Sequence, residues 1–230
     1  MAETPLSRTA QLYGDAAMAR LRAARVAVFG VGGVGGACAE SLARTGVGAL
    51  LLVDDDVVRP SNLNRQIVAT SATLGRPKVE AFAERLADAA PDCRVEARCV
   101  RYGADTADGF GLGAFNVVID AIDDVAAKAL LIRRVLAHPG VALFSSMGAA
   151  RRTDPFRIRS SEFWKVSGDG LARALRNRFR KSGDFPARKF TCVWSDEPPR
   201  AAGSVAHVTA AFGLALASLA VRSLAGAAHD

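Results

Sequence analysis

Residues 25–35, Arg25-Val26-Ala27-Val28-Phe29-Gly30-Val31-Gly32-Gly33-Val34-Gly35, decide the fold of this chain. The residues before the first glycine form an apolar run without alternation, which is typical of a buried parallel strand. A helix is expected from about Val34 to Thr45, where Gly46 ends it. Glycines spaced as G-x-G-x-x-G between a strand and a helix let the backbone approach phosphate groups, and the first helical amides then face the phosphates. The stretch therefore predicts a nucleotide-binding turn made by Gly30, Gly32, Gly33 and Gly35.

The next expected strand, 49–53, ends on an aspartate that fits the same interpretation. Asp54 lies 19 residues beyond Gly35, and a carboxylate at this place can accept hydrogen bonds from ribose hydroxyls. NAD and ATP both satisfy these features, and a tight glycine turn without any ligand is the structural alternative.

Strands and helices alternate through the first 150 residues. Further strands are expected at 94–100, 115–119 and 141–145, and helices from Pro77 and at 125–137. This alternation predicts an α/β fold with a Rossmann-like, doubly wound, mostly parallel sheet.

Past Gly148 the pattern changes into a C-terminal extension. We expect a strand at 156–160, a basic helix at 170–181 and an irregular segment at 182–199. The predicted organisation has three parts within one compact unit. Residues 1–24 form an N-terminal arm or helix, 25–150 a nucleotide-binding domain, and 151–230 a basic extension for substrate binding and dimerisation.

Composition narrows the class of protein. At 230 residues the chain is long enough for one well-buried domain and a modest appendage. Its 30 Lys and Arg against 23 Asp and Glu give a net charge of +7, which suggests ATP, RNA or a membrane surface as partner, or simply a basic soluble surface. The four cysteines form no C-x-x-C pair, so neither zinc nor a redox pair is indicated, and we expect a cytoplasmic protein with free thiols.

The segment 205–221 is almost wholly apolar, and its 17 residues reach the lower limit for a membrane span. Its many Ala and Gly residues and His207 favour a helix buried in an interface of small residues. A membrane span or a weak peripheral membrane contact is the alternative.

Two polar motifs distinguish ATP from NAD. They are Ser61-Asn62-Leu63-Asn64-Arg65-Gln66 and Gly75-Arg76-Pro77-Lys78-Val79-Glu80. A dehydrogenase needs an open slot for nicotinamide here, whereas attack of a carboxylate on the α-phosphorus of ATP needs positioned cations on the phosphates. Asp123 follows at the carboxyl end of a later expected strand, where an aspartate can hold Mg²⁺.

In this order and spacing, these motifs resemble the ThiF/MoeB/HesA superfamily of ubiquitin-activating-enzyme-like adenylating enzymes. The resemblance implies ATP and Mg²⁺ as cofactors, without zinc. It implies that Asp54 holds the ribose, that Asn62, Arg65 and Lys78 hold the phosphates, and that Asp123 holds the metal or the nucleotide. Arg8 falls where the superfamily has an arginine that reaches into the active site of the partner in a homodimer; the alternative is a solvated side chain.

Further motifs resemble one branch of the superfamily, the tRNA threonylcarbamoyladenosine dehydratases. They are the sequences 8–14, 118–123, Met147-Gly148 with Asp154-Pro155, and 192–195, with 203–224 as the closing helix. The branch implies that ATP adenylates the carboxylate of the threonylcarbamoyl group on tRNA, and that the ureido group of the same side chain then displaces AMP and closes a ring. The stretch 192–203 is shorter than expected for the branch, and 147–152 is poorer in glycine.

Cys192 and the basic run of residues 173–189 leave alternatives open. The superfamily often has a cysteine where Cys192 stands, so a thioester route competes with an inert buried thiol. The basic run can track tRNA phosphates or form a solvated helix face. Three other functions compete. The first is an adenylyltransferase for the C-terminus of a ubiquitin-like sulfur carrier, with a cysteine desulfurase or sulfur acceptor as partner. The second is an NAD-binding dehydrogenase or redox sensor, and the third is a pseudo-enzyme that binds nucleotide as a scaffold. Intact Arg65, Lys78 and Asp123 argue against the last.

Overall fold

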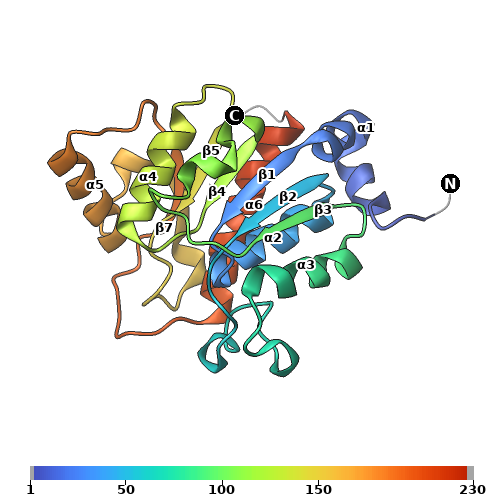
Figure 1. Cartoon of the computed structure of the whole chain (residues 1–230), viewed down its shortest axis with the longest axis horizontal. Coiled ribbons are helices and arrows are strands. Elements are labelled where there is room, and N and C mark those ends of the chain that lie inside the picture. Colours follow the sequence, from blue (N-terminus) through green and yellow to red (C-terminus); the bar gives the residue numbers. More distant parts are fainter. Residues whose placement is uncertain (1–2, 227–230) are drawn as a thin grey trace.

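The alternating strands of the first 150 residues assemble into one sheet with helices on both faces, as the computed structural model of residues 3–226 shows (Figure 1). Seven strands pair in the order β3-β2-β1-β4-β5-β7-β6, and all neighbours are parallel except β6 and β7. The expected α/β, mostly parallel sheet is therefore confirmed. The strands are β1 (Arg25–Phe29), β2 (Ala49–Val53), β3 (Arg94–Arg98), β4 (Val117–Asp120), β5 (Ala142–Ser146), β6 (Ile158–Glu162) and β7 (Thr191–Ser195).

Two apolar cores flank the sheet because successive strand residues point to opposite faces. Val26 and Val28 of β1 belong to the core under α1, α2, α3 and α6, whereas Ala27 and Phe29 belong to the core under α4 and α5. Both faces are thus covered, which explains the continuous apolar run in β1. The helices are α1 (Ser7–Ala23), α2 (Gly33–Thr45), α3 (Lys78–Ala89), α4 (Val125–Leu136), α5 (Gly170–Ser182) and α6 (Ala206–Ala225).

The strand order reverses at β1, and this reversal fixes the location of the site. The chain proceeds from β1 to β2 and β3 on one side, and later places β4 on the other side of β1. Phe29 pairs with both Val53 and Asp120, so these three strands end side by side. The connections after neighbouring strands run in opposite directions where the strand order reverses, and they leave a crevice at the carboxyl ends of those strands. Ligands of doubly wound sheets bind in this crevice.

The expectation of an irregular segment at 182–199 is wrong, because β7 lies within it. β7 is inserted between β5 and β6, and its residues Cys192 and Val193 are fully buried. The antiparallel strand β6 also begins two residues later than the expected strand at 156–160. The apolar run in β7 is only Cys192, Val193 and Trp194. Such a run is too short for periodicity to identify a strand, and the strand is stabilised by neighbouring strands that are distant in sequence.

Helix α6 packs against α2 of the same chain. At Gly213 an added Cβ would overlap the carbonyl oxygen of Val34, so only glycine allows this approach. Leu216 and Ala220 are fully buried, while Leu214 is exposed. By length and composition the helix could cross a membrane, but half of its apolar window is buried inside the fold. The interpretation of a helix in an interface of small residues is therefore confirmed, with α2 as its neighbour, while membrane contact stays a prediction.

Candidate nucleotide-binding site

A cavity of about 530 Å³ opens at the carboxyl ends of β1, β2, β4 and β5. It brings together side chains and backbone from the glycine turn, the end of β2, the loop of residues 60–66 (the 60s loop), α3 and the end of β4. Of the residues predicted for the site it contains Gly30, Gly32, Gly33, Gly35, Asp54, Asn62, Arg65, Lys78 and Asp123. Arg8 and Cys192 do not line it.

The glycine turn is tight because the backbone folds onto itself. Gly30 has a φ of +84°, a conformation that residues with a side chain rarely adopt. A Cβ on Gly35 would overlap the carbonyl oxygen of Gly30, and one on Gly33 would lie 2.8 Å from Oγ1 of Thr209 on α6. The turn therefore presents backbone rather than side chains to the cavity, as phosphate binding requires.

Asp54 holds the glycine turn as well as facing the cavity. Its Oδ2 accepts a hydrogen bond from the Val31 amide at 2.8 Å, and its Oδ1 accepts one from the Asp56 amide at 2.9 Å. Burial raises the pKa of its carboxyl group, against the opposing effect of Lys78. Each carboxylate oxygen has a further lone pair, so Asp54 can bind a ribose hydroxyl while it positions the turn.

Lys78 is a buried cation in the cavity wall. Its side chain is 5% exposed, and Nζ lies 2.6 Å from Oδ2 of Asp56, which is itself half-exposed. Asp56 was not among the residues predicted from the sequence, although it lies only two residues after Asp54. This contact holds the Lys78 ammonium in the cavity wall that also contains the glycine turn.

The 60s loop supplies a second cation and a structural amide. Nη1 of Arg65 donates to the Ser61 carbonyl at 2.9 Å and to Oδ1 of Asn64 at 3.0 Å, which leaves the rest of the guanidinium for a ligand. Oδ1 of buried Asn62 accepts from the Arg59 amide at 3.0 Å. In this structure Asn62 therefore shapes the loop that carries Arg65.

The acidic residues after β4 have different partners. Asp120 is fully buried, with Nζ of Lys128 at 2.9 Å and Oγ of Ser145 at 2.7 Å from its Oδ2. Asp124 caps α4 by accepting from the Ala127 amide at 2.8 Å. Within residues 3–226, Asp123 makes no side-chain hydrogen bond or ion pair and is exposed in the cavity. Of the acidic residues after β4, Asp123 is thus the carboxylate available to a cation or a nucleotide.

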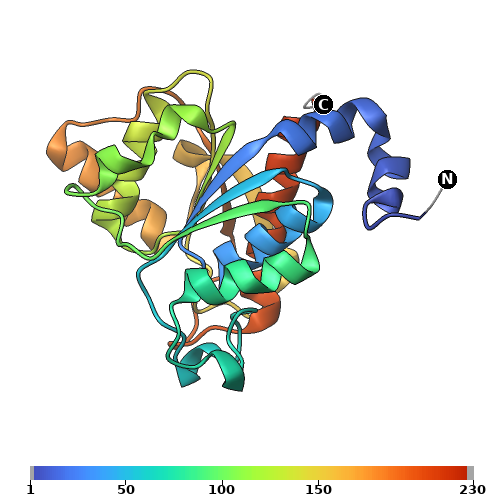
Figure 2. The same ribbon diagram turned by 45° about the vertical axis from the view of Figure 1, so that its right-hand side comes forward.

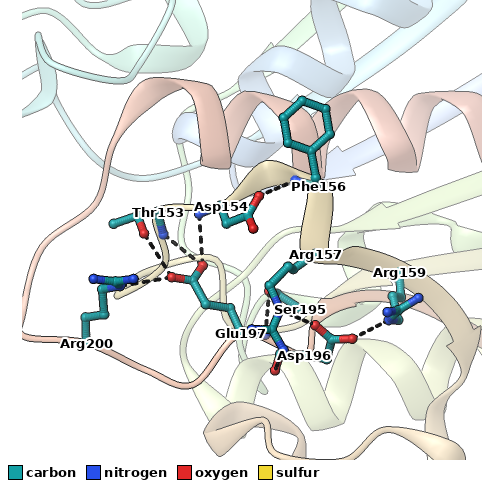
Figure 3. Close-up of polar contacts among 9 residues, drawn as sticks. All are labelled: Thr153, Asp154, Phe156, Arg157, Arg159, Ser195, Asp196, Glu197 and Arg200. Carbon is teal, nitrogen blue, oxygen red and sulfur yellow. Dashed lines mark hydrogen bonds and ion pairs between the residues drawn. The ribbon is translucent and has the colours of Figure 1, made fainter.

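The short segment between β7 and α6 is fastened beside the cavity (Figure 3). Oε2 of Glu197 accepts from the amides of Thr153 and Asp154, each at 2.9 Å, and these bonds hold the pKa of Glu197 at about 2. Farther along, Nδ2 of Asn64 donates to the carbonyl of Ser204, a residue that lines the cavity. This segment is therefore anchored to the turn after β5 and to the 60s loop.

Arg8 lies at the opposite end of the fold from this cavity. It is exposed on α1, and the neighbouring Leu6 side chain contacts Gly46, at the C-terminal end of α2. The glycine turn is at the other end of α2, a helix whose 13 residues span about 20 Å. Figures 1 and 2 show α1 at the end of the sheet opposite to the loop of residues 57–77. Arg8 therefore does not contribute to the site of its own chain.

Cys192 is a buried thiol in β7. It is fully buried, Sγ lies 3.6 Å from the Ser161 carbonyl oxygen, and burial raises its pKa to about 12. Because the thiolate is the nucleophile, a side chain in this state does not favour a thioester route.

Two residues that contact and position other site residues, Lys128 and Thr209, were not predicted from the sequence. Thr209 carried no signal, because Gly33 becomes its neighbour only in the folded protein. The pairing of Lys128 with Asp120 is also set by the fold. A lysine within an otherwise apolar helical face was the only hint for Lys128.

A glycine turn, an aspartate at the end of the next strand and two cations at the switch point of a doubly wound sheet define a nucleotide-binding protein of the Rossmann-like class. The chain belongs to the ThiF family, whose pattern matches residues 6–230. It is 40% identical over 193 residues to tRNA threonylcarbamoyladenosine dehydratase of Bacillus subtilis, covering 84% of this chain and 75% of that protein. The Escherichia coli enzyme of the same name is 37% identical over 212 residues, covering 88% of this chain and 78% of that protein. The crystal structure of E. coli tRNA N6-threonylcarbamoyladenosine dehydratase, TcdA, in complex with ATP is similar at a TM-score of 0.89 and 35% identity, with 96% of this chain and 93% of that chain covered.

Proposed function

We propose that this protein is an ATP-dependent tRNA threonylcarbamoyladenosine dehydratase. The carboxylate of the threonylcarbamoyl group attacks the α-phosphorus of ATP and releases pyrophosphate. The ureido group of the same side chain then attacks the acyl carbon, AMP leaves, and a ring closes. The observation that carries the proposal is one cavity that combines a phosphate-binding turn with Arg65, Lys78 and Asp123, in a chain whose relatives over most of its length are dehydratases.

The geometry suits an intramolecular second step. Beyond Asp123 the cavity continues along Met147 and Gly148 to Leu171 and Ser204, which leaves room for an acyl group next to the phosphates. Because the attacking ureido group is tethered to the activated carbonyl, effective molarity replaces an enzyme nucleophile. The residues of the chain then need only to bind, orient and stabilise charge on phosphate oxygens.

Mg²⁺ is the metal that the proposed reaction implies, and the donor set fits it. Mg²⁺ is commonly bound by one or two carboxylates together with substrate phosphates, and Asp123 is an unpaired carboxylate beside the phosphate turn within residues 3–226. Asp123 would hold the ion, which would neutralise charge on the phosphates.

The basic surface around α5 supports tRNA as the substrate. Residues 163–190 contain eight Lys and Arg but only two Asp, so this segment carries six of the seven net positive charges of the chain. Cationic side chains bind phosphate groups irrespective of sequence. Two arginines are exceptions: Arg188 donates to carbonyls at the end of α4 and beyond it, and the partly buried Arg176 donates to the Val166 carbonyl.

Mass spectrometry of tRNA nucleosides tests the proposal. Incubation of tRNA bearing the threonylcarbamoyl group with protein and ATP should convert that nucleoside into its cyclic form, with one AMP and one pyrophosphate per ring. If pyrophosphate exchange instead requires a carrier protein ending in Gly-Gly and tRNA is unchanged, the alternative function, adenylation of a ubiquitin-like sulfur carrier, replaces this one.

Cys192→Ala should retain most of the dehydratase activity, within about threefold, because the tethered ureido group supplies the attack. The buried thiol should also resist alkylation at pH 8, whereas exposed Cys99 should react quickly. Turnover of the variant and peptide mapping of labelled cysteines check this. Loss of ring closure with continued AMP formation would show that the thiol is required.

We further propose a two-fold homodimer in which Arg8 serves the site of the other subunit. Its distance from its own site motivates this proposal. Arg8→Ala and Lys78→Ala homodimers should each be weakly active, and mixing them after subunit exchange should restore activity, since one site of each mixed dimer is intact. A fully active monomer in sedimentation, or no gain on mixing, would contradict it.

A further inference from the structure

Two partly exposed aromatic rings, those of Trp164 and Phe185, lie next to each other in the basic segment 163–190. We call this pair of rings the step. Trp164, between β6 and α5, is 36% exposed, and Phe185, after α5, is 54% exposed. Their ring centroids are 6.1 Å apart, with 40° between the ring planes. Most large apolar side chains are buried in this fold, so two neighbouring rings open to solvent are a distinct surface feature.

Buried rings support this step from below. Trp164 contacts Phe163 and Phe179 at centroid distances of 5.1 and 6.4 Å, and Phe163 stacks on Phe190 at 4.9 Å. The Arg176 guanidinium lies 5.7 Å from the Phe163 ring and donates to the Val166 carbonyl at 2.9 Å. The tryptophan is therefore held in place before any ligand binds, which lowers the entropy lost on binding.

The step lies in a segment of the chain that is rich in exposed cations. Those near it in sequence that make no ion pair or side-chain hydrogen bond within residues 3–226 are all exposed: Lys165, Arg173, Arg178, Arg180, Lys181 and Lys189. The acidic Asp184 is neutralised by an ion pair with Arg133. Exposed rings among free cations match the chemistry of single-stranded nucleic acid, whose bases stack and whose phosphates carry charge.

Helix α5 connects the step with the nucleotide cavity. Leu171, in its first turn, lines the cavity, and the helix ends at Ser182, three residues before Phe185. The 13 residues of the helix span about 20 Å, and Figure 1 shows α5 at the outer end of the molecule. A strand of RNA whose reacting adenosine is at the cavity can thus follow α5 toward the step.

We propose that Trp164 and Phe185 stack a base of the substrate RNA near the adenosine that is modified. The inference rests on the proposed function, because it requires an RNA substrate, and unstacked bases of single-stranded RNA are commonly received by aromatic side chains. The step adds a subsite for RNA to the phosphate contacts of the basic surface.

The test compares Trp164→Ala, Trp164→Phe and Phe185→Ala with Phe156→Ala, a matched control that removes a 95% exposed ring beside β6. Replacing a stacking ring should weaken tRNA binding, measured by fluorescence anisotropy, and raise KM for tRNA by about 10-fold to 100-fold. The turnover number at saturating tRNA and KM for ATP should stay unchanged. Trp164→Phe should keep most of the affinity because it keeps a ring, and Phe156→Ala should behave as the unchanged protein.

Tryptophan fluorescence gives a readout that does not depend on catalysis. Trp194 is 7% exposed, so quenching by unmodified single-stranded RNA should arise from Trp164 and disappear in Trp164→Phe. If dehydratase activity is absent but this quenching is present, the proposed function fails and the RNA subsite stands. Unchanged tRNA affinity and KM in both alanine variants would overturn the inference, and so would unchanged affinity together with a weakened dimer, which would assign the step to subunit contact.

Discussion

Lys78→Ala and Arg65→Ala each lower the rate of acyl-adenylate formation by about 100-fold or more, the effect of losing one preorganised donor in an active site. Lys78 is almost fully buried beside the glycine turn, so water cannot replace its charge on the phosphates. Arg65 reaches the same cavity from the 60s loop. The measurement is pyrophosphate released per minute at saturating ATP and tRNA.

Arg76→Ala is the matched control for both variants. Arg76 belongs to the same motif as Lys78, pairs with Glu84 at the surface, and does not line the cavity. Its loss should change the rate by less than about twofold, because exposed ion pairs contribute little. Lys78→Ala should also remain folded, since its partner Asp56 is half-exposed and can be solvated. If both cavity variants kept the turnover number and raised only KM for ATP, the cations would bind substrate and transition state equally.

The nucleotide unit was predictable because its signals are local. The apolar run of β1, the glycine turn and the first turns of α2 lie within about twenty residues, and each constrains the backbone by itself. β7 was not predictable in this way, because only its pairing with β5 and β6 identifies it as a strand.

The site was predictable as a set of residues but not as a set of contacts. The sequence indicated that Asp54, Lys78 and Asp123 gather at one edge of the sheet, since parallel strands end together. It did not reveal that Asp54 holds Val31 or that Lys78 pairs with Asp56. Which acidic side chain stays free is decided by neighbours in three dimensions, as Asp120, Asp123 and Asp124 show.

Lys128→Met is the substitution expected to affect stability most. It should lower the free energy of unfolding by about 3–5 kcal/mol, the usual effect of removing one partner from a buried ion pair. Lys128 and Asp120 are both fully buried, and Nζ of Lys128 also donates to the Ile122 carbonyl at 2.9 Å. Methionine has a similar length but leaves the Asp120 carboxylate without its cation. Urea denaturation followed by circular dichroism measures the change.

The double variant Asp120→Asn/Lys128→Met separates stability from positioning. Without a buried charge it should regain part of the lost stability, because removing both partners is often much less destabilising than removing one. Its affinity for ATP should remain lower than that of the unchanged protein, because methionine cannot donate to the Asp120 and Ile122 carbonyls as Lys128 does. The backbone between these two residues lies against Gly30 of the glycine turn. Recovery of stability with poor ATP binding would show that the pair positions Asp123 and the turn. A destabilisation below about 1 kcal/mol in Lys128→Met would mean that the carboxylate is solvated or protonated after the substitution, and that the pair does not hold this edge of the sheet.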